Sequence, residues 1–364
     1  MSSRADRLIE DVDWRQLART LHMRRLLPTL GPRLVELAKG HTSDDFQATV
    51  DHAVDAGRRH GIFLQLVARR AIAMLADAGI RCSALKGPLL GEAIYGDPGR
   101  RPSGDIDLLV PPEQLQVAVE VIRALGYGAP SDYVDASGLP LLHLMLVHDR
   151  GELPVVELHW RVHWYERRFA CDRLLPPVPE SLGHWRPAPA DELAALLLFY
   201  ARDGFSDLRL ASDLGAWWDV CGADLPVGAL DELLRTYPAL ARVIGAALEV
   251  AERLVGLPAP LLVGNSPTLG FRGAVAVRLA NPHPTASRSQ LYADMGLIDG
   301  LLIPRGGFGA FVRRQVIPPP EVLDQQARHG ARARARSPVA RGVGVVGRYA
   351  LTMTRLLRTH GALR

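Results

Sequence analysis

The chain has 364 residues, of which 48% are hydrophobic and 23% charged, and its formal net charge is +4. This composition indicates a globular protein with room for two or three domains. No apolar stretch approaches the roughly 20 residues of a membrane span, and three scattered cysteines form neither a disulfide framework nor a zinc site. Charges occupy the N-terminus where a signal peptide has its apolar core, so we expect a cytoplasmic protein without a membrane partner.

The first 60 residues are expected to form an N-terminal helical region. Apolar residues recur at helical spacing until Gly31-Pro32. A longer helix is predicted over about 44–78, with Gly79 as its stop.

Strands and helices alternate in the next segment, 61–175, so we expect a small α/β unit there. Short strands are predicted at 80–85 and 106–110, and helices at 88–95 and from 113 to a stop at Gly126. Residues 142–148 and 155–160 are predicted to pair as an antiparallel hairpin.

A proline-rich linker precedes the C-terminal region, 190–364, which is predicted to be a helical domain with an irregular basic end. Helices are expected around Leu193–Tyr200, over 207–221 and within 227–255, whereas 259–310 shows little periodicity. The alternating Arg332, Arg334 and Arg336 fit an exposed loop or helix, and we favour a solvated tail over a nucleic-acid clamp.

Asp105 and Asp107 are the first candidates for chemistry, because they begin an apolar strand and project from one face of it. Two such carboxylates repel each other unless a cation lies between them, and Mg²⁺ binds carboxylate and phosphate oxygens. A solvated strand end is the alternative explanation of the pair.

A third carboxylate, Glu157, is predicted on the neighbouring strand, as catalysis with two metal ions requires. Glu157 and His159 share one face of this strand, and the apolar Val156, Leu158 and Trp160 point the other way. Glu157 could instead pair with Arg150 or Arg161. For His159, the alternatives are a metal ligand and a histidine of the strand face.

Lys86 is one of only two lysines among 43 basic residues, and it precedes the turn residue Gly87. A compact ammonium differs physically from a guanidinium, so this lysine is a candidate for a role that needs an ammonium.

These residues carry a resemblance. The chain resembles the uncharacterised nucleotidyltransferase family of the DNA polymerase β superfamily over roughly residues 10–225. The motifs that carry the resemblance are Leu85-Lys86-Gly87, Asp97-Pro98-Gly99-Arg100-Arg101, Asp105-Ile106-Asp107-Leu108-Leu109-Val110, Glu157-Leu158-His159-Trp160 and the helical signature over 203–214.

The resemblance implies an α+β fold, in which a short mixed sheet with flanking helices is joined by N-terminal helices and a C-terminal helical domain. It implies Mg²⁺ or Mn²⁺ as cofactor, bound by Asp105, Asp107 and Glu157. It also implies that 61–175 is the catalytic core and that nucleotide is bound by Lys86, Gly87, Arg101, Ser103 and Gly104. In this interpretation Lys86 contacts the β and γ phosphates and Arg101 braces them. Two positions depart from the family pattern: Pro88, where a serine is usual, and Asp203, where a histidine is common.

The function implied is transfer of a nucleoside monophosphate from an NTP such as ATP to an acceptor, with release of pyrophosphate. A small molecule, peptide or protein is favoured over nucleic acid as acceptor, because the charge of the chain is only mildly basic. The alternative is a catalytically weak or inactive nucleotide-binding or scaffold protein with the same fold, which the two departures would favour.

Overall fold

The structure is a computed structural model that describes residues 12–38, 40–129, 141–264, 269–280, 288–317 and 338–361. Contacts within the chain divide it into two compact units. The first comprises Met1–Ala129, Leu146–Leu158 and Pro176–Trp185, and the second comprises Pro130–Met145, His159–Leu175 and Arg186–Arg364. The domain bounds expected from the sequence, 1–60, 61–175 and 190–364, stay a prediction.

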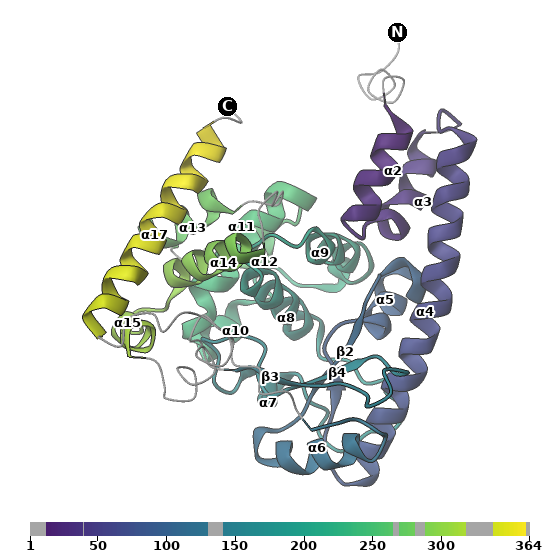
Figure 1. The fold of residues 1–364 in the computed structure, drawn as a ribbon, viewed down its shortest axis with the longest axis horizontal. Coiled ribbons are helices and arrows are strands. Elements are labelled where there is room, and N and C mark those ends of the chain that lie inside the picture. Colours follow the sequence, from purple (N-terminus) through teal and green to yellow (C-terminus); the bar gives the residue numbers. More distant parts are fainter. Residues whose placement is uncertain are drawn as a thin grey trace. The chain divides into compact units, whose positions relative to one another are not determined.

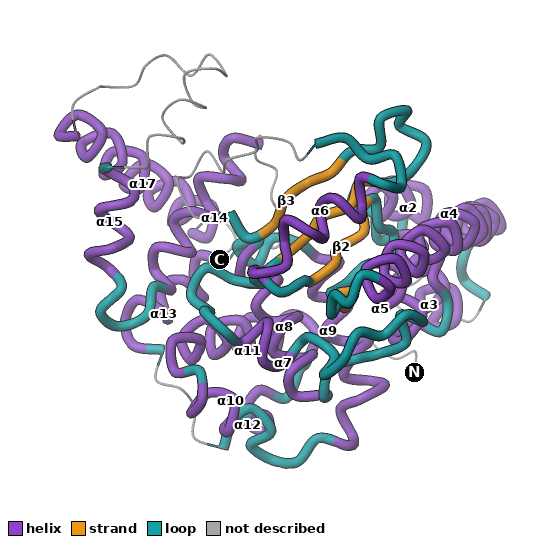
Figure 2. The backbone as a smooth tube through the Cα atoms, turned by 90° about the horizontal axis from the view of Figure 1, so that it is seen from below, coloured by secondary structure: helices purple, strands orange, loops and turns teal. Residues whose placement is uncertain are grey.

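The expected α+β class is confirmed, because the described residues are mostly helical and include a four-stranded mixed sheet (Figures 1 and 2). The strands lie in the order β1-β2-β4-β3. Their bounds are Ser83–Ala84 for β1, Asp105–Leu109 for β2, His143–Leu146 for β3 and Val155–His159 for β4. The two segments expected to pair as a hairpin are therefore neighbours in the sheet, as β3 and β4.

The N-terminal helices are α2 (Trp14–Met23), α3 (Leu27–Ala38) and α4 (Asp44–Asp77). The Ser43 side chain caps α4 by accepting a hydrogen bond from the backbone of Phe46, and two aspartates follow in the first turn. Leu64, Ile72 and Leu75 of α4 are fully buried. Figure 1 shows α3 and α5 beside this long helix, whose predicted span of 44–78 is confirmed.

Two helices flank the strands in the first unit. Helix α5 (Pro88–Tyr95) spans the residues predicted, because Pro88 suits a first helical position and Gly96 ends the helix in the left-handed region. A short 3-10 turn, η1 (Pro98–Arg100), follows. Helix α6 (Leu115–Arg123) comes after the turn η2 (Pro112–Gln114), and it buries Val119 and Ile122.

The second unit is helical, as predicted for residues beyond the linker. Helix α8 (Pro189–Arg202) is buried on all sides from Asp191 to Ala201, which explains its long apolar run. Helix α9 (Leu208–Cys221) places Trp217 in the core. The remaining helices are α7 (Phe169–Arg173), α10 (Asp231–Thr236), α11 (Ala241–Val255), α12 (Ala259–Leu262), α13 (Gly270–Leu279), α14 (Arg288–Leu302), α15 (Phe308–Val316) and α17 (Pro338–Gly361), with short 3-10 turns at Gly222–Asp224 and Pro238–Leu240.

Residues 259–310 are mostly helical where the structure describes them, although their periodicity is weak. Helix α13 contacts α11, α14 and α17, so apolar residues are needed on several of its sides. A helix packed in this way shows no single apolar stripe. Arg332, Arg334 and Arg336 lie outside the described residues. None of the described helices combines the length and the hydropathy that crossing a membrane requires.

Candidate functional site

The register between β1 and β2 brings Lys86 to the second aspartate. The strands are antiparallel, with Ser83 opposite Leu109 and Ala84 opposite Leu108. The pairing continues by one residue, because the backbone N–H of Leu85 donates to the carbonyl oxygen of Asp107 at 3.1 Å. Lys86 therefore leaves the sheet directly beside Asp107.

Asp105, Asp107 and Glu157 form one acidic cluster, because β2 and β4 are neighbours in the sheet. One carboxylate oxygen of each residue lies within 4.8 Å of those of the other two. Asp107 is buried, and the other two side chains are half-buried. Oxygen ligands at this spacing are suited to a divalent cation such as Mg²⁺, which would offset their mutual repulsion.

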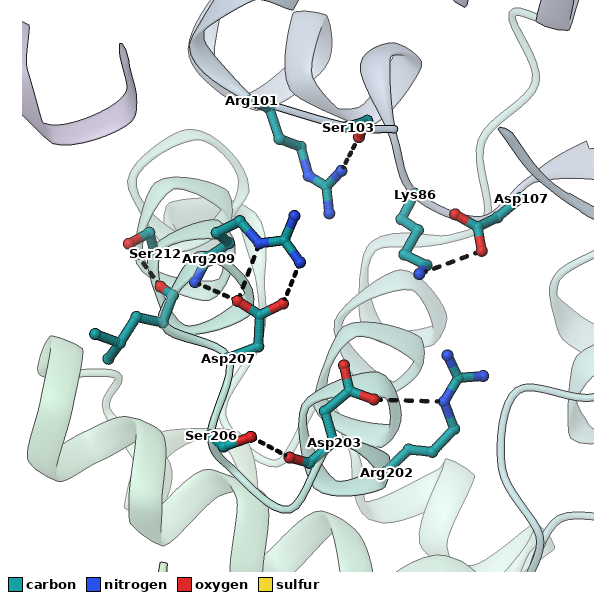
Figure 3. A network of polar contacts seen from close by, with 11 residues as sticks. Lys86, Arg101, Ser103, Asp107, Arg202, Asp203, Ser206, Asp207, Arg209 and Ser212 are labelled. Atoms are coloured by element: carbon teal, nitrogen blue, oxygen red, sulfur yellow. Dashed lines mark hydrogen bonds and ion pairs between the residues drawn. The ribbon is translucent and has the colours of Figure 1, made fainter. Parts of the chain in front are cut away.

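Burial and charge act together on Asp105. Burial raises the pKa of its carboxyl group, the charges of Asp107 and Glu157 raise it further, and those of Lys86 and Arg101 lower it. Lys86 also forms an ion pair with Asp107, with 3.2 Å between Nζ and Oδ1 (Figure 3). The cluster thus combines excess negative charge with a single ammonium at one side.

Gly87 forms the turn between β1 and helix α5. Its φ of +88° and ψ of −152° lie in a backbone region that residues other than glycine rarely adopt. An ideal Cβ at Gly87 would be in ordinary contact, at 3.8 Å, with both the Asp105 carbonyl oxygen and Ser103 Oγ, so the backbone angle is what requires glycine. The helix that follows directs its N-terminal partial charge to this turn, although Pro88 contributes no N–H.

Arg101 and Ser103 lie on the loop that leads into β2. Arg101 is only 8% exposed, and its Nη1 donates a hydrogen bond of 2.8 Å to Ser103 Oγ (Figure 3). Gly91 of α5 makes room for this arginine, since an ideal Cβ there would lie 2.8 Å from Arg101 Cβ. Gly104 is exposed and directly precedes Asp105.

The turn between α8 and α9, in the second unit, contains a polar network of its own residues (Figure 3). Asp207 caps α9 by accepting from the backbone N–H of Arg209 at 2.9 Å, and its other oxygen pairs with Arg209 Nη2 at 2.7 Å. The sequence interpretation missed Asp207, although an aspartate before an apolar helical run is a recognised capping signal. Asp203 Oδ1 lies 3.8 Å from Arg202 Nε. Burial lowers the pKa of Arg209, but the hydrogen bond and charge of Asp207, together with the charge of buried Asp213, raise it above its ordinary value.

His159 is fully buried. Its ring lies 4.7 Å from that of His143 and 6.2 Å, edge to face, from that of Phe199. Both alternatives for His159, a metal ligand and a histidine of the strand face, stay predictions.

A short mixed sheet, three carboxylates on adjacent strands and a glycine turn leading into a helix make up the arrangement of a nucleotidyltransferase-like protein. Comparison with protein families places the chain within this class: residues 10–256 match the family described as uncharacterised nucleotidyltransferase. The match covers well over half of the chain, which therefore belongs to this family. Comparison with curated proteins and with solved structures gave no match.

Proposed function

We propose that the protein is a metal-dependent nucleotidyltransferase that moves a nucleoside monophosphate from an NTP to an acceptor. The observation that carries the proposal is the clustering of Asp105, Asp107 and Glu157, whose ligand atoms lie within 4.8 Å of one another. Family membership implies the NTP substrate. The acceptor is proposed to be a small molecule, peptide or protein.

The three carboxylates would hold Mg²⁺ or Mn²⁺. Bound there, the cation would supply charge neutralisation to the phosphate oxygens. An acceptor oxygen would form the new bond to the α-phosphorus while the bond to pyrophosphate breaks, and the acceptor proton would pass to a carboxylate of the cluster, for which Glu157 is our candidate.

The basic side of the site would bind the triphosphate. Lys86 is proposed to contact the β and γ phosphates as a point charge, and Arg101 to brace them, with Ser103 holding the guanidinium at 2.8 Å. Gly87 and Gly104 would let the backbone approach the phosphates closely. These contacts neutralise charge on the departing pyrophosphate, which is where electrostatic stabilisation is most effective.

A second candidate function is nucleotide binding without turnover. It is favoured by Pro88, which stands at the first position of α5 and so removes one backbone donor from the phosphate side of the site. The two functions share nucleotide binding and differ in the release of pyrophosphate.

The deciding experiment offers each of the four NTPs, labelled at the α-phosphate, to the protein in a cell extract with Mg²⁺ or Mn²⁺. We expect the wild-type protein to label a macromolecule or a small molecule and to release pyrophosphate, and Asp105→Asn to abolish both. Asp45→Asn is the matched control, because the side chain of Asp45 is 88% exposed and remote in sequence from the cluster.

Three outcomes discriminate between the functions. Label transfer that survives Asp105→Asn would exclude the proposed metal site. Calorimetry that shows metal-dependent NTP binding without pyrophosphate release would favour the binding protein. The chemical nature of the labelled product would identify the class of acceptor.

A further inference from the structure

The loop that carries Arg101 and Ser103 does not run directly from α5 to β2. After Gly96 it contacts α3 and α4 through η1, and it then returns to the sheet at Asp105. Ser103 Oγ lies near the Gly87 turn, because an ideal Cβ on that glycine would be 3.8 Å from it. The position of the loop therefore determines where Arg101 and Ser103 lie relative to the acidic cluster.

Two glycines of α4, four residues apart, let the loop backbone approach the helix. An ideal Cβ on Gly57 would lie 2.4 Å from the carbonyl oxygen of Gly99, and one on Gly61 would lie 2.7 Å from that of Pro98. In the opposite direction, a Cβ on Gly99 would lie 2.3 Å from the backbone nitrogen of Arg58. Because the opposing atoms belong to the backbone, any larger side chain would displace the loop.

An ion pair fixes the start of the loop on the same helix. Arg58 donates to Asp97 Oδ2 from Nη2 at 2.6 Å and from Nε at 3.0 Å. Asp97 Oδ1 accepts from the backbone N–H of Gly99 at 2.8 Å, so the aspartate joins the helix to the turn. Burial would raise the pKa of Asp97, but the hydrogen bonds from Arg58 and Gly99 hold it below its ordinary value.

Helix α3 holds the next residue of the loop from another side. Thr29 is buried, and its Oγ1 donates to the carbonyl oxygen of Arg100 at 2.6 Å. The Arg100 side chain returns a hydrogen bond from Nη2 to the Thr29 carbonyl oxygen at 3.2 Å. The backbone on the N-terminal side of Arg101 is thereby fixed in two directions.

We infer that Gly57, Gly61 and Thr29 are positioning residues, which place Arg101 and Ser103 at the phosphate side of the site. The consequence for substrate binding rests on the proposed function, whereas the control of the loop position does not. In this inference the N-terminal helices act on the reaction through the loop, without touching the substrate.

The first measurement is amide hydrogen exchange of the full chain over residues 97–104. Gly57→Ala and Gly61→Ala should each lose protection in this segment. Gly344→Ala is the matched control, because Gly344 lies within helix α17 and an ideal Cβ there meets nothing within 4 Å. Unchanged protection of residues 97–104 in both α4 variants would overturn the inference.

Thr29→Val provides a variant that creates no backbone clash. It replaces the hydroxyl donor to Arg100 by a methyl group of similar size, so it tests the inference even if the glycine variants fail to fold. We expect the same segment to lose protection, with an unchanged far-UV circular dichroism spectrum. Full retention of protection in this variant would contradict the inference.

The second measurement is the binding of inorganic triphosphate with Mg²⁺ by calorimetry, since this group is common to all NTPs. Thr29→Val should weaken binding about tenfold in the wild-type background and have no further effect on Arg101→Met. An equal loss in both backgrounds would assign Thr29 a merely structural role. If the wild-type chain binds no triphosphate, the proposed function fails, and the exchange data alone decide whether these residues position the loop.

Discussion

Lys86 Nζ lies 3.2 Å from Asp107 Oδ1, and the two side chains are only 17% and 1% exposed. Asp107 lies on β2 and Lys86 follows β1, and their proximity follows from the backbone hydrogen bond between Leu85 and Asp107. A carboxylate as deeply buried as Asp107 needs a compensating charge. In the absence of substrate, Lys86 provides one.

Removing the ammonium should therefore destabilise the first unit. We expect Lys86→Met to lower the free energy of unfolding by about 3 kcal/mol, because it removes one partner of a buried ion pair. Adding Asp107→Asn to this variant should restore part of the loss, since the second change removes the remaining charge. Urea unfolding of both single variants and the double variant gives the coupling energy, and additive effects would contradict a direct pairing.

The hydroxyl of Ser103 should matter through Arg101. Ser103→Ala removes the acceptor for the buried guanidinium, and we expect a loss of about 1 kcal/mol in the free energy of unfolding. Ser103→Thr keeps the hydroxyl and should lose less. Thermal unfolding of the two variants, side by side, measures the difference. Equal losses would show that the hydrogen bond contributes nothing to stability.

Asp207 combines a helix cap with an ion pair, and two substitutions separate these contributions. Asp207→Ser keeps a capping oxygen for α9 but removes the charge opposite Arg209, whereas Asp207→Ala removes both. We expect the alanine variant to be less stable than the serine variant by about 1 kcal/mol. Urea unfolding measures this difference, and equal stabilities would exclude the cap as a source of stability.

Glu166 should make stability depend on pH. Glu166 is only 2% exposed, and burial raises the pKa of its carboxyl group to about 7, although the backbone N–H groups of Val162 and Ala170 partly oppose this rise. The folded state therefore favours the protonated form. Its stabilising effect is fully present below the ordinary pKa of about 4.5 and is lost as the pH rises to about 7.

Glu166→Gln should remove this dependence, because the amide stays neutral. Between pH 4.5 and 7 the wild-type chain should lose up to about 3 kcal/mol more stability than the variant, and above pH 7 the difference should be constant. Unfolding midpoints of both proteins across this range provide the test. Parallel pH profiles would show that Glu166 does not titrate with the raised pKa.

The acidic cluster could be anticipated because its signal is local. Aspartates two residues apart share a strand face, and the alternation around Glu157 correctly predicts the full burial of Val156 and Leu158. The one long-range arrangement that completes the cluster is the pairing of β2 with β4, which brings Glu157 to the two aspartates. The turn at Gly87 and the bounds of α5 were predictable for the same reason.

The support of the loop could not be anticipated from the sequence. Gly57 and Gly61 within a helical pattern indicate only a weaker helix, because nothing local tells that their partners are Gly99 and Pro98. Asp97 has the sequence signal of a turn residue, and this signal is the same whether or not Asp97 pairs with Arg58, which is distant in the sequence. Such contacts depend on how the chain returns to α4, which periodicity and spacing do not encode.

The contacts of the loop with α3 and α4 limit how far the chain can be shortened. A fragment that starts at residue 61 would retain Lys86 and all three carboxylates, yet it would lack Thr29, Gly57 and Arg58, which hold the loop between α5 and β2. Relative to the full chain, we expect such a fragment to keep more of its cation binding than of its triphosphate binding. In evolutionary terms, the N-terminal helices and the strands that carry the acidic cluster must then be inherited together, as one module.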